Sequence, residues 1–119
     1  TERVFLSLIE NFMAYLNQTC FTTLKSCEVH YALYKPGTFY KRHLDQFTTD
    51  SGRQFSIVSY LNNDWKVDDG GELILYTKDA PITVLPKGGR IVFFKSDELE
   101  HEVMPSKRDR MSLTGWLKN

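Results

Sequence analysis

The sequence predicts one mainly β domain, an antiparallel sandwich, barrel or jelly roll, with an amphipathic helix at its N-terminus. After Cys27 the chain consists of short runs rich in β-branched and aromatic residues, and no helical pattern separates them. Turn-forming residues lie between the runs, as in all-β folds. Because 119 residues suffice to bury a sizeable core, we expect a single domain over residues 1–119.

The N-terminal segment has the periodicity of a helix with one apolar face. Apolar residues recur three or four positions apart, at Val4, Phe5, Leu8, Ile9, Phe12, Met13 and Leu16. Glu2, Glu10 and Asn11 fall on the opposite side. Such a helix is stable when its apolar face covers another element, so we expect it to pack on the sheet.

The β-rich runs follow in order along the rest of the chain. They are 28–34 (EVHYALY), 54–62 (QFSIVSYLN), 71–77 (GELILYT), 82–85 (ITVL), 90–94 (RIVFF), 101–103 (HEV) and 110–117 (RMSLTGWL). Turn signals between them occur at Pro36–Gly37, Asp69–Gly71, Pro86–Gly89 and Pro105.

Composition is ordinary for a globular protein and points to no charged partner. Lys plus Arg and Asp plus Glu balance at 15 each, with 41% hydrophobic and 25% charged residues. We therefore expect neither nucleic acid nor a membrane as partner. No apolar run approaches the roughly 18 residues that a membrane span needs.

Cysteine usage predicts a cytoplasmic protein. Cys20 and Cys27 are too few for a disulfide framework, so we expect reduced thiols, and the neighbouring Phe21 suits a buried one. The chain begins at Thr1 rather than Met, which leads us to expect a sequence truncated at its N-terminus.

Three residues have the identity and spacing of a metal site. His43 and Asp45 are two positions apart, so on a strand they would point the same way, and His101 follows 58 positions after His43. Two imidazoles and one carboxylate hold Fe(II) on one face and leave its other positions open. An H-x-D triplet occurs by chance in roughly one chain of ten at this length, but here two of only three histidines join the arrangement.

Residues further along the chain extend this site. We place His43 and Asp45 at the start of one strand and His101 on a late one, and these meet only if the sheet folds over on itself, as in a double-sheet jelly roll. Alternation then puts Val103 beside His101. It also puts Arg110, Ser112, Thr114 and Trp116 on one face of the next strand, where Arg110 could bind a carboxylate in bidentate fashion.

Two tyrosines and a histidine leave alternatives open. Tyr34 and Tyr60 each come at or near the end of a β-rich run, where the phenol either lines the pocket or simply packs. His30 shares strand parity with Tyr34, so it either faces the pocket or lies hydrogen-bonded at the sheet margin.

These residues belong to longer strings that carry a resemblance over nearly the whole chain. The strings are YKPGTFYKRHLD (34–45), SYLNNDW (59–65), GGEL (70–73), GGRIVFFKSD (88–97), HEVMP (101–105) and RMSLTGW (110–116). They resemble the prolyl 4-hydroxylase group of Fe(II)/2-oxoglutarate dioxygenases. The pattern is closer to bacterial relatives of the hypoxia-inducible-factor prolyl hydroxylases than to the collagen enzymes, which have lysine where Arg110 stands.

The resemblance implies a double-stranded β-helix, a jelly roll of the cupin type, and a role for each site residue. His43, Asp45 and His101 would bind iron, while Arg110 and Tyr60 would bind the distal carboxylate of 2-oxoglutarate. The other residues of the cosubstrate pocket would be Tyr34, Val58, Leu73, Val103 and Trp116. Ser112 departs from the animal pattern and resembles the R-x-S pairing of other 2-oxoglutarate oxygenases, so it would add a second hydroxyl to the clamp. The resemblance places Tyr40 nearer the substrate side. We also expect the pocket mouth, bordered by Tyr40, Arg42, loop 47–53 and Trp65, to be an open groove that accepts a proline in a peptide.

The implied activity is hydroxylation of a prolyl residue in a peptide or protein. It would consume Fe(II)-bound 2-oxoglutarate and O2 and release succinate and CO2, with ascorbate as a candidate reductant. A first alternative is an oxygenase of a free amino acid or another small molecule, which the short polar loop 47–53 would favour if it closed as a lid. A second is a non-catalytic cupin-like binding module, against which Arg110 and Tyr60 argue.

Overall fold

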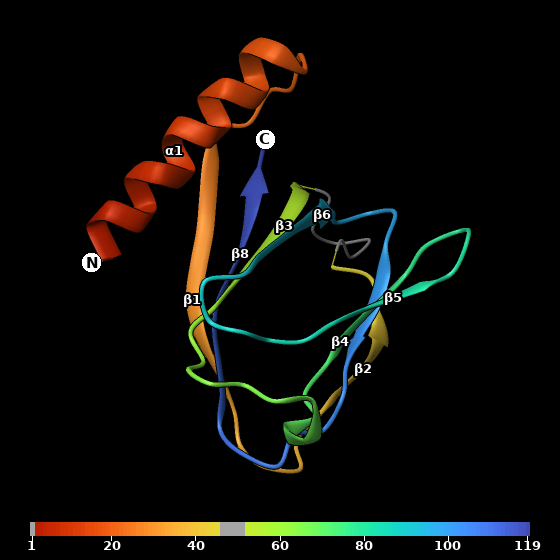
Figure 1. Cartoon of the computed structure of the whole chain (residues 1–119). Coiled ribbons are helices and arrows are strands. Elements are labelled where there is room, and N and C mark those ends of the chain that lie inside the picture. Colours follow the sequence, from red (N-terminus) through yellow and green to blue (C-terminus); the bar gives the residue numbers. More distant parts are fainter. Residues whose placement is uncertain (1, 46–51) are drawn as a thin grey trace.

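The computed structural model describes residues 2–45 and 52–119, and within them one helix precedes two four-stranded antiparallel sheets (Figure 1). The first sheet has the strand order β1-β8-β3-β6 and the second β2-β7-β4-β5. The elements are α1 (Glu2–Thr19), β1 (Ser26–Tyr34), β2 (Tyr40–His43), β3 (Arg53–Tyr60), the 3-10 turn η1 (Val67–Asp69), β4 (Leu73–Tyr76), β5 (Pro81–Val84), β6 (Ile91–Lys95), β7 (Glu100–Val103) and β8 (Arg110–Lys118). The predicted mainly β, double-sheet fold is confirmed.

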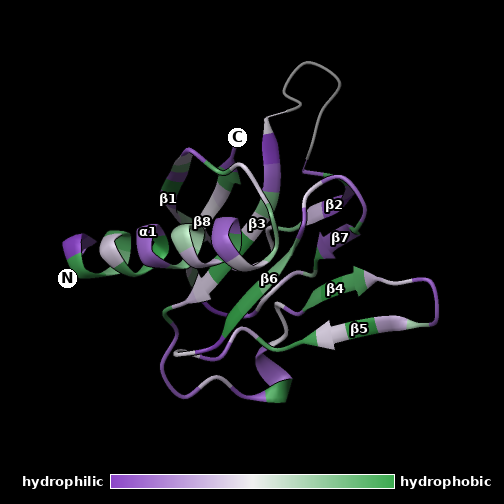
Figure 2. Cartoon of the chain, turned by 90° about the horizontal axis from the view of Figure 1, so that it is seen from above, coloured by the Kyte–Doolittle hydropathy of each residue, from purple (hydrophilic) through white to green (hydrophobic). Residues whose placement is uncertain are grey.

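Helix α1 packs on the outer face of the first sheet, on the side away from the second sheet (Figures 1 and 2). Its buried residues Ile9, Met13 and Leu16 lie one helical turn apart and form a cluster with Leu24 and Leu117. The helix expected over 4–16 is therefore confirmed and extends by a few residues at each end.

The thiols differ from expectation in one respect. Cys20 and Cys27 are both free, and Cys27 is half-buried, but Cys20 is exposed. The helix ends at Thr19, and Phe21 adopts a left-handed backbone with φ of 56°. This turn leaves the Phe21 side chain 89% exposed, so it provides no apolar cover for Cys20.

An apolar core fills part of the space between the sheets. Leu73, Leu75, Phe94 and Val103 form the core cluster between the sheets. Strand β8 separates this space from the helix: successive side chains alternate in direction, so Trp116 faces the space between the sheets while Leu117 is fully buried against α1. One strand thus contributes to both the helix packing and the interior of the sandwich.

Strand β2 was not among the predicted runs. Its sequence YKRH holds two basic residues and no β-branched one, so it lacks the composition of a strand. It pairs with β7, with a register shift between Tyr40 and His43. The expectation that His43 and Asp45 start a strand is wrong: His43 ends β2, and Asp45 lies in the bend that follows.

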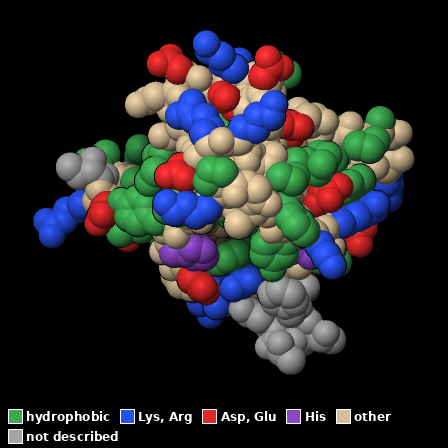
Figure 3. Space-filling model, turned by 90° about the horizontal axis from the view of Figure 1, so that it is seen from below, with side chains coloured by type: hydrophobic (Ala, Val, Ile, Leu, Met, Phe, Trp, Pro, Cys, Tyr) green, Lys and Arg blue, Asp and Glu red, His purple; other side chains and the backbone are tan. Residues whose placement is uncertain are grey.

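No helix in the described ranges is both long and apolar enough to cross a membrane. On the face drawn in Figure 3, Lys and Arg side chains are interspersed with Asp and Glu side chains and with apolar groups. This mixture agrees with the balanced formal charge of the sequence.

Candidate active site

His43, Asp45 and His101 come together between the sheets. Each offers one ligand atom, and these atoms all lie within 4.8 Å of one another. Asp45 Oδ1 is 3.3 Å from His43 Nε2 and 3.2 Å from His101 Nε2. The geometry arises because His43 and His101 are cross-strand partners on β2 and β7, with ring centroids 4.3 Å apart.

Backbone carbonyls orient both imidazoles toward the metal position. His43 Nδ1 is 2.6 Å from the carbonyl oxygen of Lys41, and His101 Nδ1 is 3.1 Å from that of Leu99. A carbonyl oxygen only accepts, so Nδ1 must carry the proton, and in the neutral ring Nε2 then has a free lone pair. This is the arrangement in which a second partner fixes the tautomer of a metal-ligating histidine.

The third ligand candidate, Asp45, is buried and ionised. Burial alone would raise the pKa of its carboxyl, but the close approach of the two histidine rings to Oδ1 and the hydrogen bond from Ser56 outweigh burial and hold the pKa far below its usual range. Ser56 Oγ donates to Asp45 Oδ2 at 2.6 Å. The carboxylate is therefore available as an anionic ligand at any physiological pH.

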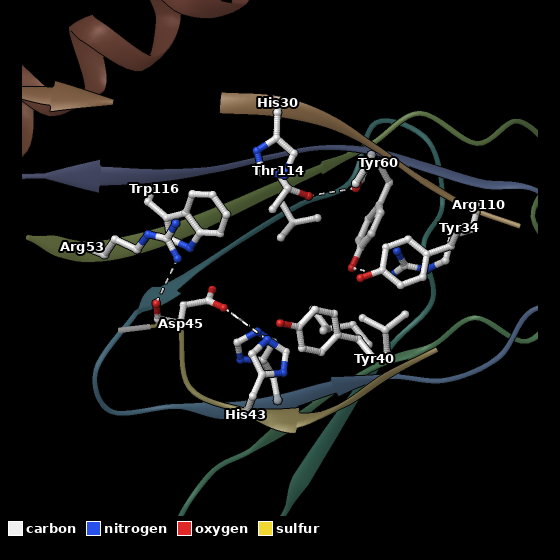
Figure 4. Close-up of a pocket in the computed structure, with 16 residues that line it drawn as sticks. His30, Tyr34, Tyr40, His43, Asp45, Arg53, Tyr60, Arg110, Thr114 and Trp116 are labelled. Atoms are coloured by element: carbon white, nitrogen blue, oxygen red, sulfur yellow. Dashed lines mark hydrogen bonds and ion pairs between the residues drawn. The ribbon is translucent and has the colours of Figure 1, made fainter. Parts of the chain in front are cut away.

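The three residues line a cavity of about 190 Å³ whose far side holds Arg110 (Figure 4). Of the fourteen site residues expected from the sequence, twelve line this cavity. They are His43, Asp45, His101, Arg110, Tyr60, Ser112, Tyr34, Val58, Leu73, Val103, Trp116 and Tyr40. The strands thus bring the predicted metal and cosubstrate residues to one place.

Arg110 is a buried cation held in a fixed orientation. It is 3% exposed, and its Nε donates to the Gly71 carbonyl at 2.8 Å. Its Nη2 approaches Tyr60 Oη at 3.5 Å, and its guanidinium lies 5.3 Å from the centroid of the Tyr34 ring. Burial lowers the pKa of Arg110, with Tyr60 and Tyr34 partly opposing this, and raises the pKa of Tyr60.

No carboxylate in the described part of the chain lies within ion-pair distance of Arg110. A buried cation without a counter-ion is costly, because the interior solvates charge poorly. An anionic ligand would remove this cost. The cavity therefore has a cation at one end and a metal-ligand triad at the other, which fits a small molecule with a carboxylate at one end and metal-chelating oxygens at the other.

Two expected substrate residues lie outside the cavity lining. Arg42 sits on the outer face of the second sheet, where its Nη2 is 2.7 Å from Glu100 Oε2 and its guanidinium covers the Tyr76 ring. Trp65 is buried, and its Nε1 donates to the Gly70 carbonyl at 2.9 Å. Neither residue lines the cavity, because Arg42 points outward from β2 and Trp65 packs under the turn that precedes β4; their place at the pocket mouth stays a prediction.

Tyr40 and His30 do face the cavity. Tyr40 is 45% exposed, and its ring lies 3.9 Å from that of His43 between centroids, which places it beside the metal position with one side open to solvent. His30 lines the opposite wall, 5.4 Å from the Trp116 ring between centroids. Of the two readings of His30, the structure shows the one in which it faces the pocket.

Arg53 ends the loop expected at the pocket mouth, and it lines the cavity itself, a position that the sequence did not predict for it. Its guanidinium lies 3.7 Å from the centroid of the Trp116 ring, and its Nη1 donates to the Asp45 carbonyl at 3.2 Å. On a regular strand Arg53 would point away from Tyr60 and Val58, because its position has the opposite parity. A register shift between Arg53 and Phe55 changes that direction, and such irregularities are invisible in the sequence pattern. Residues 47–51 of the loop expected to border the pocket mouth lie outside the described ranges.

Comparison with known proteins places this chain in one superfamily, whose family model matches most of the sequence. The family model of the 2OG-Fe(II) oxygenase superfamily matches residues 29–118, and the chain belongs to that superfamily. It is similar to a hypoxia-inducible factor prolyl hydroxylase of Caenorhabditis elegans, with 42% identity over 84 residues that cover 67% of this chain and 12% of the relative.

Two solved structures share the fold. A prolyl-4-hydroxylase of Pseudomonas putida superposes with a TM-score of 0.94 at 43% identity, covering 97% of this chain and 65% of that one. A prolyl hydroxylase of Trichoplax adhaerens, in complex with a peptide fragment of the hypoxia inducible factor oxygen degradation domain, gives 0.90 at 27% identity, covering 98% and 55%. The predicted resemblance to bacterial relatives of these hydroxylases is confirmed, while the chain spans under two thirds of each of these proteins.

The superfamily uses Fe(II), 2-oxoglutarate and O2, and the residues present fit these groups. Two neutral imidazoles and a carboxylate are the donors of non-haem Fe(II) sites with open positions. The buried cation Arg110, which has no carboxylate partner in residues 2–45 and 52–119, fits the distal carboxylate of the cosubstrate.

Proposed function

We propose that this protein is an Fe(II)- and 2-oxoglutarate-dependent dioxygenase that hydroxylates prolyl residues in a peptide or protein. The observation that carries the proposal is that one cavity holds both the His43, Asp45 and His101 cluster and the buried cation of Arg110, which has no carboxylate partner among the described residues. A metal-binding module without turnover has no need of the second feature. Membership of the superfamily and similarity to prolyl hydroxylases support the same reaction class.

In this proposal His43, Asp45 and His101 hold the metal on one face. Bound Fe(II), with 2-oxoglutarate and O2, supplies an oxidation coupled to the release of succinate and CO2. Arg110 and the Tyr60 hydroxyl hold the distal carboxylate of 2-oxoglutarate, with the buried Ser112 hydroxyl available as a further donor. The side chains of Tyr34, Val58, Leu73, Val103 and Trp116 exclude water around the cosubstrate.

The substrate side is the part of the cavity beside Tyr40, whose half-exposed ring is suited to contact a prolyl ring. The Trichoplax adhaerens relative is described in complex with a peptide, which supports an extended peptide rather than a free amino acid. We therefore propose a proline-containing segment of a peptide or protein as substrate.

The test compares succinate formation with proline-containing peptides, free proline and other free amino acids, together with mass spectrometry for the gain of one oxygen. We expect peptides to stimulate succinate formation and to gain oxygen, and free proline to do neither. Asp45→Ala serves as the inactive control. Coupling to a free amino acid alone would establish the small-molecule oxygenase instead. The absence of any 2-oxoglutarate turnover despite bound metal would establish the non-catalytic binding module.

A further inference from the structure

The two oxygens of the Asp45 carboxylate have different surroundings. Oδ1 is the atom that faces His43 Nε2 and His101 Nε2, at 3.3 and 3.2 Å, and so faces the position that a metal would take. Oδ2 accepts a hydrogen bond from Ser56 Oγ at 2.6 Å. One carboxylate oxygen is thus directed to the metal position and the other is engaged by the protein.

The donor and acceptor roles of Ser96, Ser56 and Asp45 follow from the number of protons that each group has. An ionised carboxylate only accepts hydrogen bonds, so the Ser56 hydroxyl donates its single proton to Asp45 Oδ2. Ser56 Oγ also lies 2.8 Å from Ser96 Oγ, so Ser96 must be the donor in that contact. Ser56 is 1% exposed and Ser96 is 0% exposed, which keeps bulk water from replacing either partner. The order is Ser96 to Ser56 to Asp45.

The two serines stand on paired strands of the first sheet, whereas Asp45 does not belong to a strand. Ser56 lies on β3 opposite Phe94 of β6, and Ser96 follows the end of β6, where its N–H donates to the Gln54 carbonyl at 3.0 Å. Asp45 lies in the bend after β2, on the second sheet. The serine pair therefore joins the carboxylate to two paired strands of the other sheet.

We propose that Ser56 and Ser96 are positioning residues for the metal centre, holding Asp45 as a ligand through Oδ1 alone. This inference rests on the metal site of the proposed function. The hydrogen bond to Oδ2 opposes the rotation by which the carboxylate would bind through both oxygens, and the coordination position that bidentate binding would consume stays open for cosubstrate. Ser96 acts only through Ser56, by orienting its hydroxyl proton toward Asp45.

The variants are Ser56→Ala, Ser96→Ala, the double variant and Ser56→Thr, which retains a hydroxyl. The control is Ser106→Ala, because Ser106 is also buried but donates to the Arg108 carbonyl, away from the metal ligands. The readouts are the affinity for Mn(II), measured by electron paramagnetic resonance, and the visible spectrum of bound Co(II), which responds to coordination number. Neither depends on turnover.

We expect Ser56→Ala to weaken Mn(II) binding on the order of tenfold, the lower end of the effect seen when partners of metal ligands are removed. The Co(II) spectrum should change with it. Ser96→Ala should shift both readouts less, and should add nothing in the Ser56→Ala background. Ser56→Thr should restore the wild-type spectrum, and Ser106→Ala should leave both readouts unchanged.

Two results would overturn the inference. One is a folded Ser56→Ala or Ser96→Ala variant with wild-type Mn(II) affinity and a wild-type Co(II) spectrum, which would mean that the pair only satisfies two buried hydroxyls. The other is that Ser96→Ala changes the Mn(II) affinity equally in the wild-type protein and in Ser56→Ala, which would show that Ser96 does not act through Ser56. If the unmodified protein itself binds no Mn(II), the metal site of the proposed function fails, and this outcome is distinct from the first.

Discussion

Arg110 owes its orientation to contacts on two sides of its guanidinium. The Gly71 carbonyl accepts from Nε at 2.8 Å, and the Tyr60 hydroxyl lies 3.5 Å from Nη2. A lysine at this position would keep the charge but has neither the planar fork nor the Nε donor. The interaction that holds the cosubstrate in our proposal therefore depends on the shape of this residue as well as on its charge.

Arg110→Lys should raise the 2-oxoglutarate requirement by roughly ten- to a hundredfold, because a bidentate charged hydrogen bond is lost. The measurement is the 2-oxoglutarate KM, or the titration of the metal-bound protein with 2-oxoglutarate in the absence of oxygen. Arg108→Lys is the matched control, since Arg108 is nearby but only partly buried and lies over the Trp65 ring outside the cavity. Unchanged 2-oxoglutarate binding in Arg110→Lys would remove Arg110 from the clamp.

His43 makes metal binding sensitive to pH. Burial would lower the pKa of its imidazole, but the hydrogen bonds to Asp45 and to the Lys41 carbonyl raise it more, so the metal-free protein holds a proton there at higher pH than an ordinary histidine does. Since a ligating imidazole must be neutral, that proton competes with the metal.

We therefore expect Mn(II) affinity to fall as the pH is lowered, by up to about tenfold per pH unit for each proton displaced. The fall should start at a pH above the ordinary histidine pKa of about 6.5. The measurement is a Mn(II) titration between about pH 8 and about pH 5.5. His30→Gln should show the same dependence, because His30 is not part of the ligand cluster. A pH-independent affinity over this interval would contradict the assignment of the histidines as ligands.

The turn at Gly70 and Gly71, between η1 and β4, positions Arg110 by presenting the Gly71 carbonyl to its Nε. Both glycines have left-handed backbones, with φ of 72° and 71°. Trp65 Nε1 donates to the Gly70 carbonyl, and a Cβ on Gly71 would lie 3.0 Å from the Trp65 ring and 3.2 Å from Arg110 Cδ. Trp65 thus supports the turn that presents the Gly71 carbonyl to Arg110.

Gly71→Ala should destabilise the fold and raise the 2-oxoglutarate KM severalfold, because the added Cβ pushes against Arg110. Gly37→Ala is the control: Gly37 also has a positive φ, of 86°, but a Cβ there meets nothing within 4 Å. Both variants should lose roughly 1 kcal/mol of unfolding free energy to backbone strain. Only Gly71→Ala should also change the 2-oxoglutarate KM. The measurements are the KM and, by urea unfolding, the free energy of unfolding of both variants. Equal KM values for the two variants would show that the turn does not influence the clamp.

At the scale of the whole molecule, the candidate metal site connects the two sheets. His43 and His101 lie on paired strands of the second sheet, while Asp45 is tethered through Ser56 to the first. A bound metal would therefore crosslink elements that otherwise meet mainly through side-chain packing. Binding that occurs only in the folded state stabilises that state in proportion to the logarithm of metal concentration.

Mn(II) at about one hundred times its dissociation constant should add about 2.7 kcal/mol to the free energy of unfolding. Removal of the metal by a chelator should reverse the gain, as followed by thermal unfolding. Asp45→Ala should stay folded, because Asp45 lies in a bend outside the two core clusters, but should lose the metal-dependent increment and Fe(II)-dependent turnover. The same increment in Asp45→Ala would place the metal elsewhere.

Much of the site could be predicted because strand alternation is local. On β8, Arg110, Ser112, Thr114 and Trp116 share a face, as their even spacing predicted, and all four line the cavity. The positions that differ from expectation involve breaks in that regularity. Arg53 turns inward at a register shift, Asp45 lies past the end of its strand, and Trp65 packs under a turn.

The sequence by itself determined the mainly β fold, the helix that covers one sheet, the ligand types and the cation of the clamp. These follow from residue identity and short-range periodicity, which depend on the local chain alone. The cytoplasmic location inferred from the thiols stays a prediction. Only the tertiary structure decided that β2 pairs with β7 so that His43 meets His101, and that Ser56 and Ser96 engage Asp45. Those contacts join residues distant in the chain, and their geometry depends on strand register and bulges that no local pattern encodes.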